Sequence, residues 1–333
     1  HSWLFTGIFG NGFFNYGYLG VDFYFIVTGY LMIQSIYKHP LSNDTSILKD
    51  SFQYITRKFK NLFPALLISF IIGIFFVYNL SDLKLSFILS NHLLPELFQL
   101  SVLGYDLNIN SSWWYISSMF LALSVLYPIA RKYNKDYGIY LAPVLLVFTL
   151  GLVYTKSINI NDPTTISFFL RNGFYKAIIF IILGNISFYI TDKIKHISFS
   201  NRVKIILSIV EFVLYSLLFL NLHFMWIDTF IFAILMMISI SLSFSNITYL
   251  PKKFKNSFWK KLGNYGFYIY LCNISIRTFM IHTYMNYQNA CCFYSYKYLS
   301  IHFVLISCVV ALFIYILVEI IYKRYFLSKF KNR

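Results

Sequence analysis

The sequence predicts an all-α integral membrane protein, and three observations support this fold class. Hydrophobic residues make up 58% of the chain and charged residues only 12%, whereas a soluble domain carries about 25% charged residues. Apolar stretches repeatedly reach the ~20 residues needed to cross a ~30 Å hydrocarbon core. No long polar segment separates them, so residues 1–333 are predicted to form a single polytopic membrane domain.

Nine stretches are long enough to cross the membrane, and most of the connections between them are short. The predicted spans are residues 17–37, 61–79, 113–130, 137–155, 172–191, 204–222, 225–246, 264–285 and 299–322. The chain begins with His1, and residues 1–16 contain no complete span. We therefore expect that an N-terminal segment is missing: either one further span, which gives about ten in the intact protein, or a signal peptide.

Basic residues alternate in density along the connections between the predicted spans. Most of the 28 Lys and Arg residues lie in every second connection, and the others hold only Lys84, Lys156 and Lys297. Basic connections stay on the cytoplasmic side of a membrane. The pattern predicts a protein integral to the plasma membrane, the inner membrane of a bacterium, with a cytoplasmic C-terminus. It also explains the net charge of +16 without a nucleic-acid partner.

Ionisable side chains within spans are costly in a bilayer, so each one is a candidate for function. The candidates are Asp22, Glu211, Arg277 and Glu319, with Arg171 and Lys176 near an outer edge. For Glu319 a structural role is favoured, since Lys323 follows one helical turn later. Glu211 faces either Lys204 or the interior of the helix bundle. Asp22 lies near the outer end of its span, where a carboxylate is either functional or hydrated.

Arg57, Lys58 and Lys60 form a basic cluster at the predicted cytoplasmic end of the span 61–79. Such a cluster is first an anchor that fixes topology. It is also placed to bind the phosphates of a cytosolic nucleotide-like donor, because arginine offers a bidentate fork.

Two further features are candidates for function. A neutral imidazole at His1 can accept a proton from an alcohol. None of the other six histidines has a second histidine one turn away, so no metal site is predicted. The long outer connection, residues 80–112, either covers a cavity and grips a substrate or forms an interfacial helix without such a role.

Several of these pieces together resemble the acyltransferase type 3 family of membrane acyltransferases. The family pattern Gly-x-x-Gly-Val-(Asp/Glu)-x-Phe-Phe-x-x-Ser-Gly-(Phe/Tyr)-Leu matches residues 17–31, GYLGVDFYFIVTGYL, with Tyr24 for one Phe and Thr28 for Ser. The family's Arg-x-x-Arg before a proline matches residues 57–64, with Lys60 for the second Arg.

Three shorter motifs follow in the order that the family shows. Residues 114–116, WYI, match a Trp-Tyr-(Ile/Leu) motif, and Arg171 followed by Leu183-Gly184 matches an Arg…Leu-Gly element. Residues 262–273, LGNYGFYIYLCN, keep the frame of a motif that usually ends in His, which is Asn273 here. Asparagine does not transfer protons, so the resemblance gives Asn273 no catalytic role.

The resemblance implies transfer of an acyl group, most often acetyl, from acyl-CoA to a hydroxyl of a cell-surface glycan or lipid-linked sugar. His1 would be the catalytic base, and Asp22 would help to arrange the catalytic centre. Arg57 and Lys60 would hold the donor phosphates.

The same resemblance implies three substrate-binding residues. Trp114 and Tyr115 would line the site near its outer side, and Arg171 would also contact substrate. Acyl-CoA is then the only co-substrate, with membrane lipid around the protein and no nucleic-acid partner.

Two rivals remain open from the sequence. A transporter or flippase for a glycan or lipid-linked sugar would show a similar set of spans, but it often carries inverted repeats, and none is visible here. An inactive scaffold relative is compatible with the departures at Lys60 and Asn273. The oligomeric state is not predicted.

Overall fold

The computed structural model describes residues 19–41, 46–78, 85–105, 109–220, 229–288 and 296–319. These residues are mainly helical and contain no β-strand, apart from one isolated bridge between Ile166 and Arg171. The predicted all-α fold is therefore confirmed for the described part of the chain.

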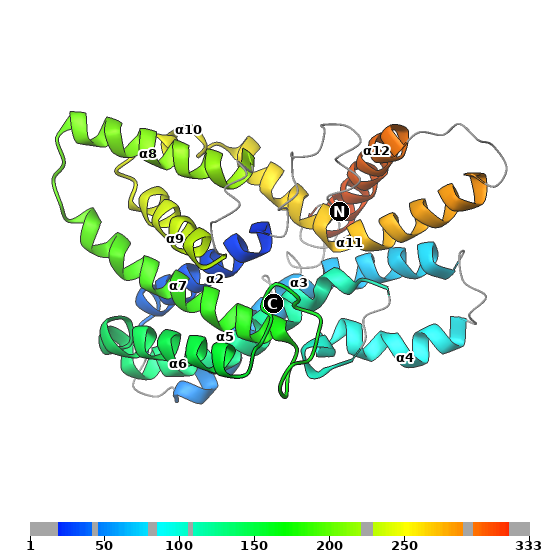
Figure 1. Ribbon diagram of the computed structural model, residues 1–333, viewed down its shortest axis with the longest axis horizontal. Helices are drawn as coiled ribbons and strands as arrows, with labels where there is room; N and C mark the ends of the chain where they lie inside the picture. Colours follow the sequence, from blue (N-terminus) through cyan, green and yellow to red (C-terminus); the bar gives the residue numbers. More distant parts are fainter. Residues whose placement is uncertain are drawn as a thin grey trace, which may run out of the picture. The chain divides into compact units, whose positions relative to one another are not determined.

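The helices follow one another along the chain (Figure 1). The α-helices are α2 (Leu19–Lys38), α3 (Ile47–Tyr78), α4 (Leu85–Leu97), α5 (Trp114–Asp136), α6 (Ala142–Thr155), α7 (Asn172–Lys195), α8 (Asn201–Leu220), α9 (Thr229–Ser245), α10 (Leu250–Lys253), α11 (Ser257–Gln288) and α12 (Tyr296–Tyr315). The 3-10 helices η1 (Leu100–Leu103) and η2 (Ser111–Trp113) precede α5, and the π-helix η3 (Tyr137–Leu141) joins α5 to α6.

Within the described residues, five helical segments are long and apolar enough to cross a membrane. They are Leu19–Lys38, Ile47–Phe76, Ser111–Thr155, Asn172–Lys195 and His302–Glu319. The third segment covers two predicted spans, and the helical path is kinked between them at Asn134, whose φ is 42°. The other predicted spans fall on α8, α9 and α11. The protein is thus an all-helical membrane protein, and the count of nine spans stays a prediction.

The described helices group into two compact units. Unit 1 lies within His1–Ile55 and Ser118–Asn256, and unit 2 lies within Thr56–Ser117 and Ser257–Arg333. In unit 1, α7 packs against α2, α6 and α9, and α8 packs against α9. In unit 2, α11 packs against α12 and η2, while α4 packs against η1.

The contact between α2 and α7 brings two helix backbones very close together. A β-carbon at Gly29 would overlap the carbonyl of Ile181, and one at Gly184 would overlap the carbonyl of Ile26. Small residues permit this approach in membrane helices, where van der Waals packing drives association. The motif helix α2 is therefore fixed against α7 at two reciprocal positions.

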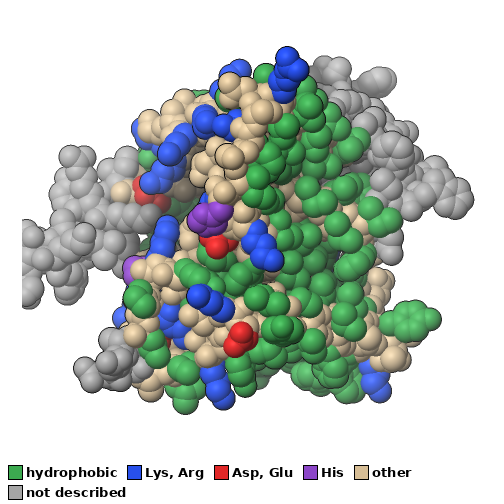
Figure 2. Space-filling view, turned by 90° about the vertical axis from the view of Figure 1, so that its left-hand side faces the viewer, with side chains coloured by type: hydrophobic (Ala, Val, Ile, Leu, Met, Phe, Trp, Pro, Cys, Tyr) green, Lys and Arg blue, Asp and Glu red, His purple; other side chains and the backbone are tan. Residues whose placement is uncertain are grey.

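Charged and apolar side chains are separated on the face shown in Figure 2. Lys and Arg side chains gather over one part of this face, beside a broad apolar part. This separation is typical of a protein whose apolar surface meets lipid and whose basic surface lies at a membrane boundary.

Candidate functional site

The carboxylate predicted to be functional, Asp22, forms a buried ion pair in unit 1. The Lys176 ammonium on α7 lies 2.9 Å from an Asp22 oxygen on α2, and the two side chains are 3% and 0% exposed. Lys176 also lies over the Phe180 ring, 5.7 Å from its centroid. The desolvation of two charges often exceeds their attraction, so such a pair is weak evidence for stability and a strong candidate for function.

The sequence placed Asp22 and Lys176 on separate spans but did not pair them. Both residues lie near the same predicted edge of the membrane, and this common depth was the signal that could have joined them. The structure adds the close approach of α2 and α7, which brings the two charged groups into contact.

A second polar residue supports the crossing of α2 and α7. The amide oxygen of Asn185 accepts a hydrogen bond from the Tyr137 hydroxyl at 2.7 Å. Its amide nitrogen donates to the carbonyls of Gly29 and Ile181 at 2.8 and 3.2 Å. Asn185 is fully buried. Because it bonds to the backbone of both helices, it fixes the rotation of α2 and so the direction of Asp22.

Arg171, predicted to bind substrate, immediately precedes α7 in the same unit. Its side chain is mostly buried, and one guanidinium nitrogen donates to the Thr164 carbonyl at 2.7 Å. The next residue, Asn172, donates from its side chain to the carbonyls of Asn159 and Asp162 at 3.0 and 3.1 Å. These bonds tie the connection before α7 to its first turn, so Arg171 organises this loop.

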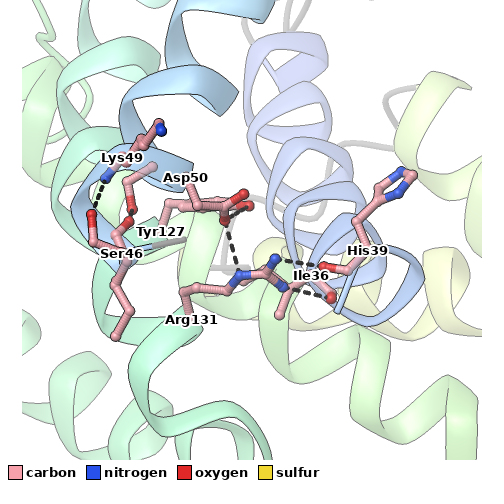
Figure 3. Close-up of polar contacts among 9 residues, drawn as sticks. Ile36, His39, Ser46, Lys49, Asp50, Tyr127 and Arg131 are labelled. Atoms are coloured by element: carbon pink, nitrogen blue, oxygen red, sulfur yellow. Dashed lines mark hydrogen bonds and ion pairs between the residues drawn. The ribbon is translucent and has the colours of Figure 1, made fainter. Parts of the chain in front are cut away.

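Arg131 lies at the centre of a polar cluster that the sequence did not identify (Figure 3). Its guanidinium donates to two carbonyls at the end of α2, that of Ile36 at 2.8 Å and that of His39. The guanidinium also forms an ion pair with Asp50 of α3, at 2.9 Å. The Tyr127 hydroxyl also donates to Asp50, at 2.9 Å. A cation at a helix C-terminus satisfies free carbonyls and the helix dipole. Arg131 therefore joins the end of α2 to the first turn of α3.

The predicted donor-binding residues lie on α3, in unit 2. Arg57 and Lys60 are both exposed, and a spacing of three residues puts them on one side of the helix. Between them, Phe59 packs against Phe63 and Phe98, with ring centroids 5.5 and 6.3 Å apart. The aromatic contacts hold this part of α3, while the two basic side chains stay accessible to an anion.

Two of the predicted motif segments meet in unit 2. The Trp113 indole donates to the Leu271 carbonyl at 2.9 Å, and the Tyr270 hydroxyl donates to the Ser112 carbonyl. The Tyr115 ring meets the Tyr270 ring edge-on, with centroids 6.0 Å apart.

Burial differs along the Trp113–Tyr115 segment of unit 2. Trp113 is fully buried, Tyr115 is buried, and Trp114 is half-buried. Trp113, which the sequence did not single out, is therefore the anchor that positions the predicted pair Trp114 and Tyr115.

A buried carboxyl anchors the long connection before α5. Glu96 on α4 is fully buried and accepts the Ile109 N–H at 2.9 Å. Burial raises the pKa of Glu96 to about 7, although the N–H groups of Ile109 and Asn110 act in the opposite direction. The Ser275 hydroxyl of α11 lies 2.9 Å from the Ile109 carbonyl and 2.6 Å from the Asn110 side-chain oxygen.

Hydrogen bonds also hold the part of this connection around η1, residues 99–104. The Ser117 hydroxyl accepts the Val102 N–H at 3.0 Å and donates to the Gln99 carbonyl. Gln99 and Gly104, with φ of 58° and 102°, bound the short helix η1. This part of the predicted outer loop is thus folded into unit 2 by buried polar contacts, which the sequence did not predict.

Two other candidate carboxylates, Glu211 and Glu319, each accept a hydrogen bond from a neighbouring hydroxyl. Glu211 accepts from the Ser243 hydroxyl, which itself bonds to the Tyr215 hydroxyl at 2.8 Å, so Glu211 faces α9. Glu319 accepts from the Tyr268 hydroxyl at 2.7 Å. The predicted base, His1, lies outside the described residues.

Comparison with known proteins gives one match. The acyltransferase domain of the acyltransferase type 3 family matches residues 1–320, which is nearly the whole chain. No curated protein and no solved structure matches the chain significantly.

Proposed function

Because the chain belongs to the acyltransferase type 3 family, we propose that it transfers an acyl group, acetyl in particular, from acyl-CoA to a hydroxyl of a cell-surface glycan or lipid-linked sugar. The family and the apolar helices make it a membrane acyltransferase. The buried pair of Asp22 and Lys176 is the observation that carries the proposal for this chain, because charges buried within a membrane helix bundle are costly and mark functional sites.

The proposed chemistry needs one base and one anion-binding element. The acceptor oxygen attacks the thioester carbonyl, the C–O bond forms, and the C–S bond breaks. The hydroxyl proton passes through the His1 imidazole to the departing thiolate, which leaves as free CoA. Asp22 arranges the catalytic centre, with Lys176 holding its carboxylate.

Substrate-binding residues complete the proposal. The exposed side chains of Arg57 and Lys60 bind the phosphates of CoA, since three residues of helix place two cations side by side. Trp114 and Tyr115 contact the acceptor, as does Arg171. The donor is made in the cytosol, so we place Arg57 and the C-terminus on the cytoplasmic side of the plasma membrane.

Acyl transfer is tested directly with purified protein in lipid nanodiscs. Release of free CoA thiol and mass spectrometry of the acceptor are measured with short-chain acyl-CoA, with and without a glycan bearing free hydroxyls. We expect thiol release that depends on the acceptor, with an acyl ester on the glycan. Absence of release with every short-chain acyl-CoA would overturn the proposal, and glycan movement across a bilayer without release would indicate a transporter.

The role of His1 is tested in the same assay. His1→Ala should lose acyl transfer, because the proposed mechanism passes the hydroxyl proton through this imidazole, while the thermal unfolding midpoint stays unchanged. Retained turnover in this variant would remove His1 from the mechanism and leave the transferase assignment standing.

A further inference from the structure

The connection between α6 and α7 ends in an exposed apolar tip. Ile166, Phe168 and Phe169 are 51%, 50% and 62% exposed, in a loop whose other exposed residues are mostly polar. Adjacent exposed apolar side chains on a folded loop mark a surface that meets another apolar phase or a partner.

The tip is held in place by its own loop. Ile166 bridges to Arg171, and the Asn172 N–H donates to the Thr165 carbonyl at 2.8 Å. Between the bridged residues, Leu170 turns inward and is buried. The aromatic tip is thus presented outward by a hydrogen-bonded backbone, so its exposure is a property of the fold.

Two rings of the tip are also fixed by contacts. The Phe169 ring meets Phe168 and the buried Tyr175 edge-on, with centroids 4.9 and 6.1 Å away. The Lys156 ammonium lies 5.3 Å from the centroid of the Phe168 ring. Lys156 follows the last residue of α6, so the tip is joined through this lysine to the end of that helix.

An exposed apolar face also runs the length of α6, which ends just before the loop that carries the tip. Val144, Val147, Phe148 and Tyr154 are 62%, 70%, 68% and 86% exposed, at spacings that put them on one side of the helix. The candidate span Ser111–Thr155 contains α6, so we expect this side to face lipid. Lys156 follows this face and contacts the Phe168 ring of the tip.

The depth of the tip follows from the ends of the two helices. One candidate span ends at Thr155 and the next begins at Asn172, so the connection starts and finishes at a membrane boundary. Phe169 is only three residues before Asn172. Aromatic rings with a neighbouring lysine are typical of this boundary, where the apolar body is buried and the ammonium reaches water.

We propose that Ile166, Phe168 and Phe169, with Tyr154 and Lys156, insert into the lipid interface and anchor the beginning of α7 at a set depth. The partner of this surface is lipid, at the depth where the headgroups meet the acyl chains. Because Lys176 lies on the first turns of α7, the anchor also sets the depth of the ion pair with Asp22.

The proposal is tested in lipid nanodiscs, where both membrane faces are accessible. Single cysteines replace Phe168, Phe169 or, as a matched control in the same loop, the exposed Asn161. Reaction with a membrane-impermeant maleimide is followed by peptide mass spectrometry, which separates the native cysteines. The unsubstituted protein is labelled with a carbene reagent dissolved in the lipid.

We expect Phe168→Cys and Phe169→Cys to react about tenfold more slowly than Asn161→Cys, since the thiolate forms in water and not in lipid. The carbene should label residues 166–169 of the unsubstituted protein and leave Asn161 unlabelled. Equal maleimide rates at all three positions, or no carbene label at 166–169, would overturn the proposal. Protection that appears only when a soluble glycan is added would assign the tip to a carbohydrate instead.

Discussion

Replacing Glu96 with Gln should abolish the loss of stability that unit 2 shows as pH rises. The carboxyl is fully buried, one oxygen accepts the Ile109 N–H, and the other has no hydrogen-bond partner among the described residues. Glutamine has the same shape and keeps the acceptor, but it carries no charge at any pH. The substitution therefore isolates the ionisation of this one group.

The magnitude follows from the pKa of Glu96, which burial raises from 4.5 to about 7. Below pH ~4.5 the carboxyl is protonated in both states, and its contribution to stability is fully present. As pH rises, the unfolded state loses the proton first, so stability falls until the folded state ionises near pH 7. A difference of about 2.5 pH units, at ~1.4 kcal/mol each, amounts to about 3.5 kcal/mol over the whole range.

Hydrogen exchange of residues 98–113 measures this effect locally. The exchange rates at pH 5 and pH 8, corrected for the intrinsic pH dependence, report how often the segment opens. Part of the loss precedes pH 5, because the unfolded state ionises near pH 4.5. In the unsubstituted protein, protection should therefore fall by about 70-fold between these pH values, which corresponds to about 2.5 kcal/mol. In Glu96→Gln, protection from exchange should be the same at pH 5 and at pH 8.

Asp162→Asn is the matched control in unit 1. The hydroxyls of Thr165 and Thr164 lower the pKa of Asp162, so its contribution is lost only as pH falls into the acid range. No change between pH 5 and pH 8 is expected from this substitution. Glu96 does not cause the pH dependence if Glu96→Gln keeps the pH dependence of the unsubstituted protein, or if the unsubstituted protein shows none.

Three further predictions concern the other charged groups. Asp22→Asn or Lys176→Met alone should destabilise the protein by about 3–5 kcal/mol, whereas the double variant should regain most of this and remain inactive, as read by chemical unfolding and CoA release. Arg57→Ala should raise the KM for acyl-CoA about tenfold, or ~1.4 kcal/mol, with little change in kcat. Arg131→Ala should cost about 2 kcal/mol of stability, because the Ile36 and His39 carbonyls lose this donor and Asp50 loses its ion pair while keeping the Tyr127 hydroxyl, as read by thermal unfolding.

A specific result would contradict each of the predictions for the ion pair, Arg57 and Arg131. An active double variant would make the ion pair purely structural. An unchanged KM in Arg57→Ala would leave Arg57 as a topology anchor, and Lys49→Ala, also exposed on α3, is the control. The exposed neighbour Lys132 is the control for Arg131, and equal stability losses on replacing either would remove the special role of Arg131.

The helices and the most specific motif could be read from the sequence. Runs of apolar residues predict membrane helices, because the bilayer requires every backbone group to be bonded within its own segment. Among the described residues each of the nine predicted spans overlaps a helix, but only five helical segments meet the requirements of length and apolar character, so the number of spans stays a prediction. The motif of residues 17–31 singled out Asp22 before its partner was known.

The partners of the polar residues could not be read from the sequence. From the sequence, Lys176 is a lysine near a membrane edge, Arg131 is one of the basic residues of an inner connection, and Glu96 belongs to the long outer connection without an assigned role. Their roles depend on contacts with residues 154, 81 and 13 positions away. No local pattern reports such distances, because the contacts arise from the packing of whole helices.

The sequence by itself determined the class of protein, the apolar segments around which the membrane helices form and the residues that resemble the family motifs. These properties are local, since hydrophobic length and short motifs act within one segment. Only the tertiary structure decided which charges meet. Gly29 and Gly184 let α2 and α7 approach closely, and this approach buries Asp22 against Lys176. A buried charge persists only where packing supplies its counter-charge.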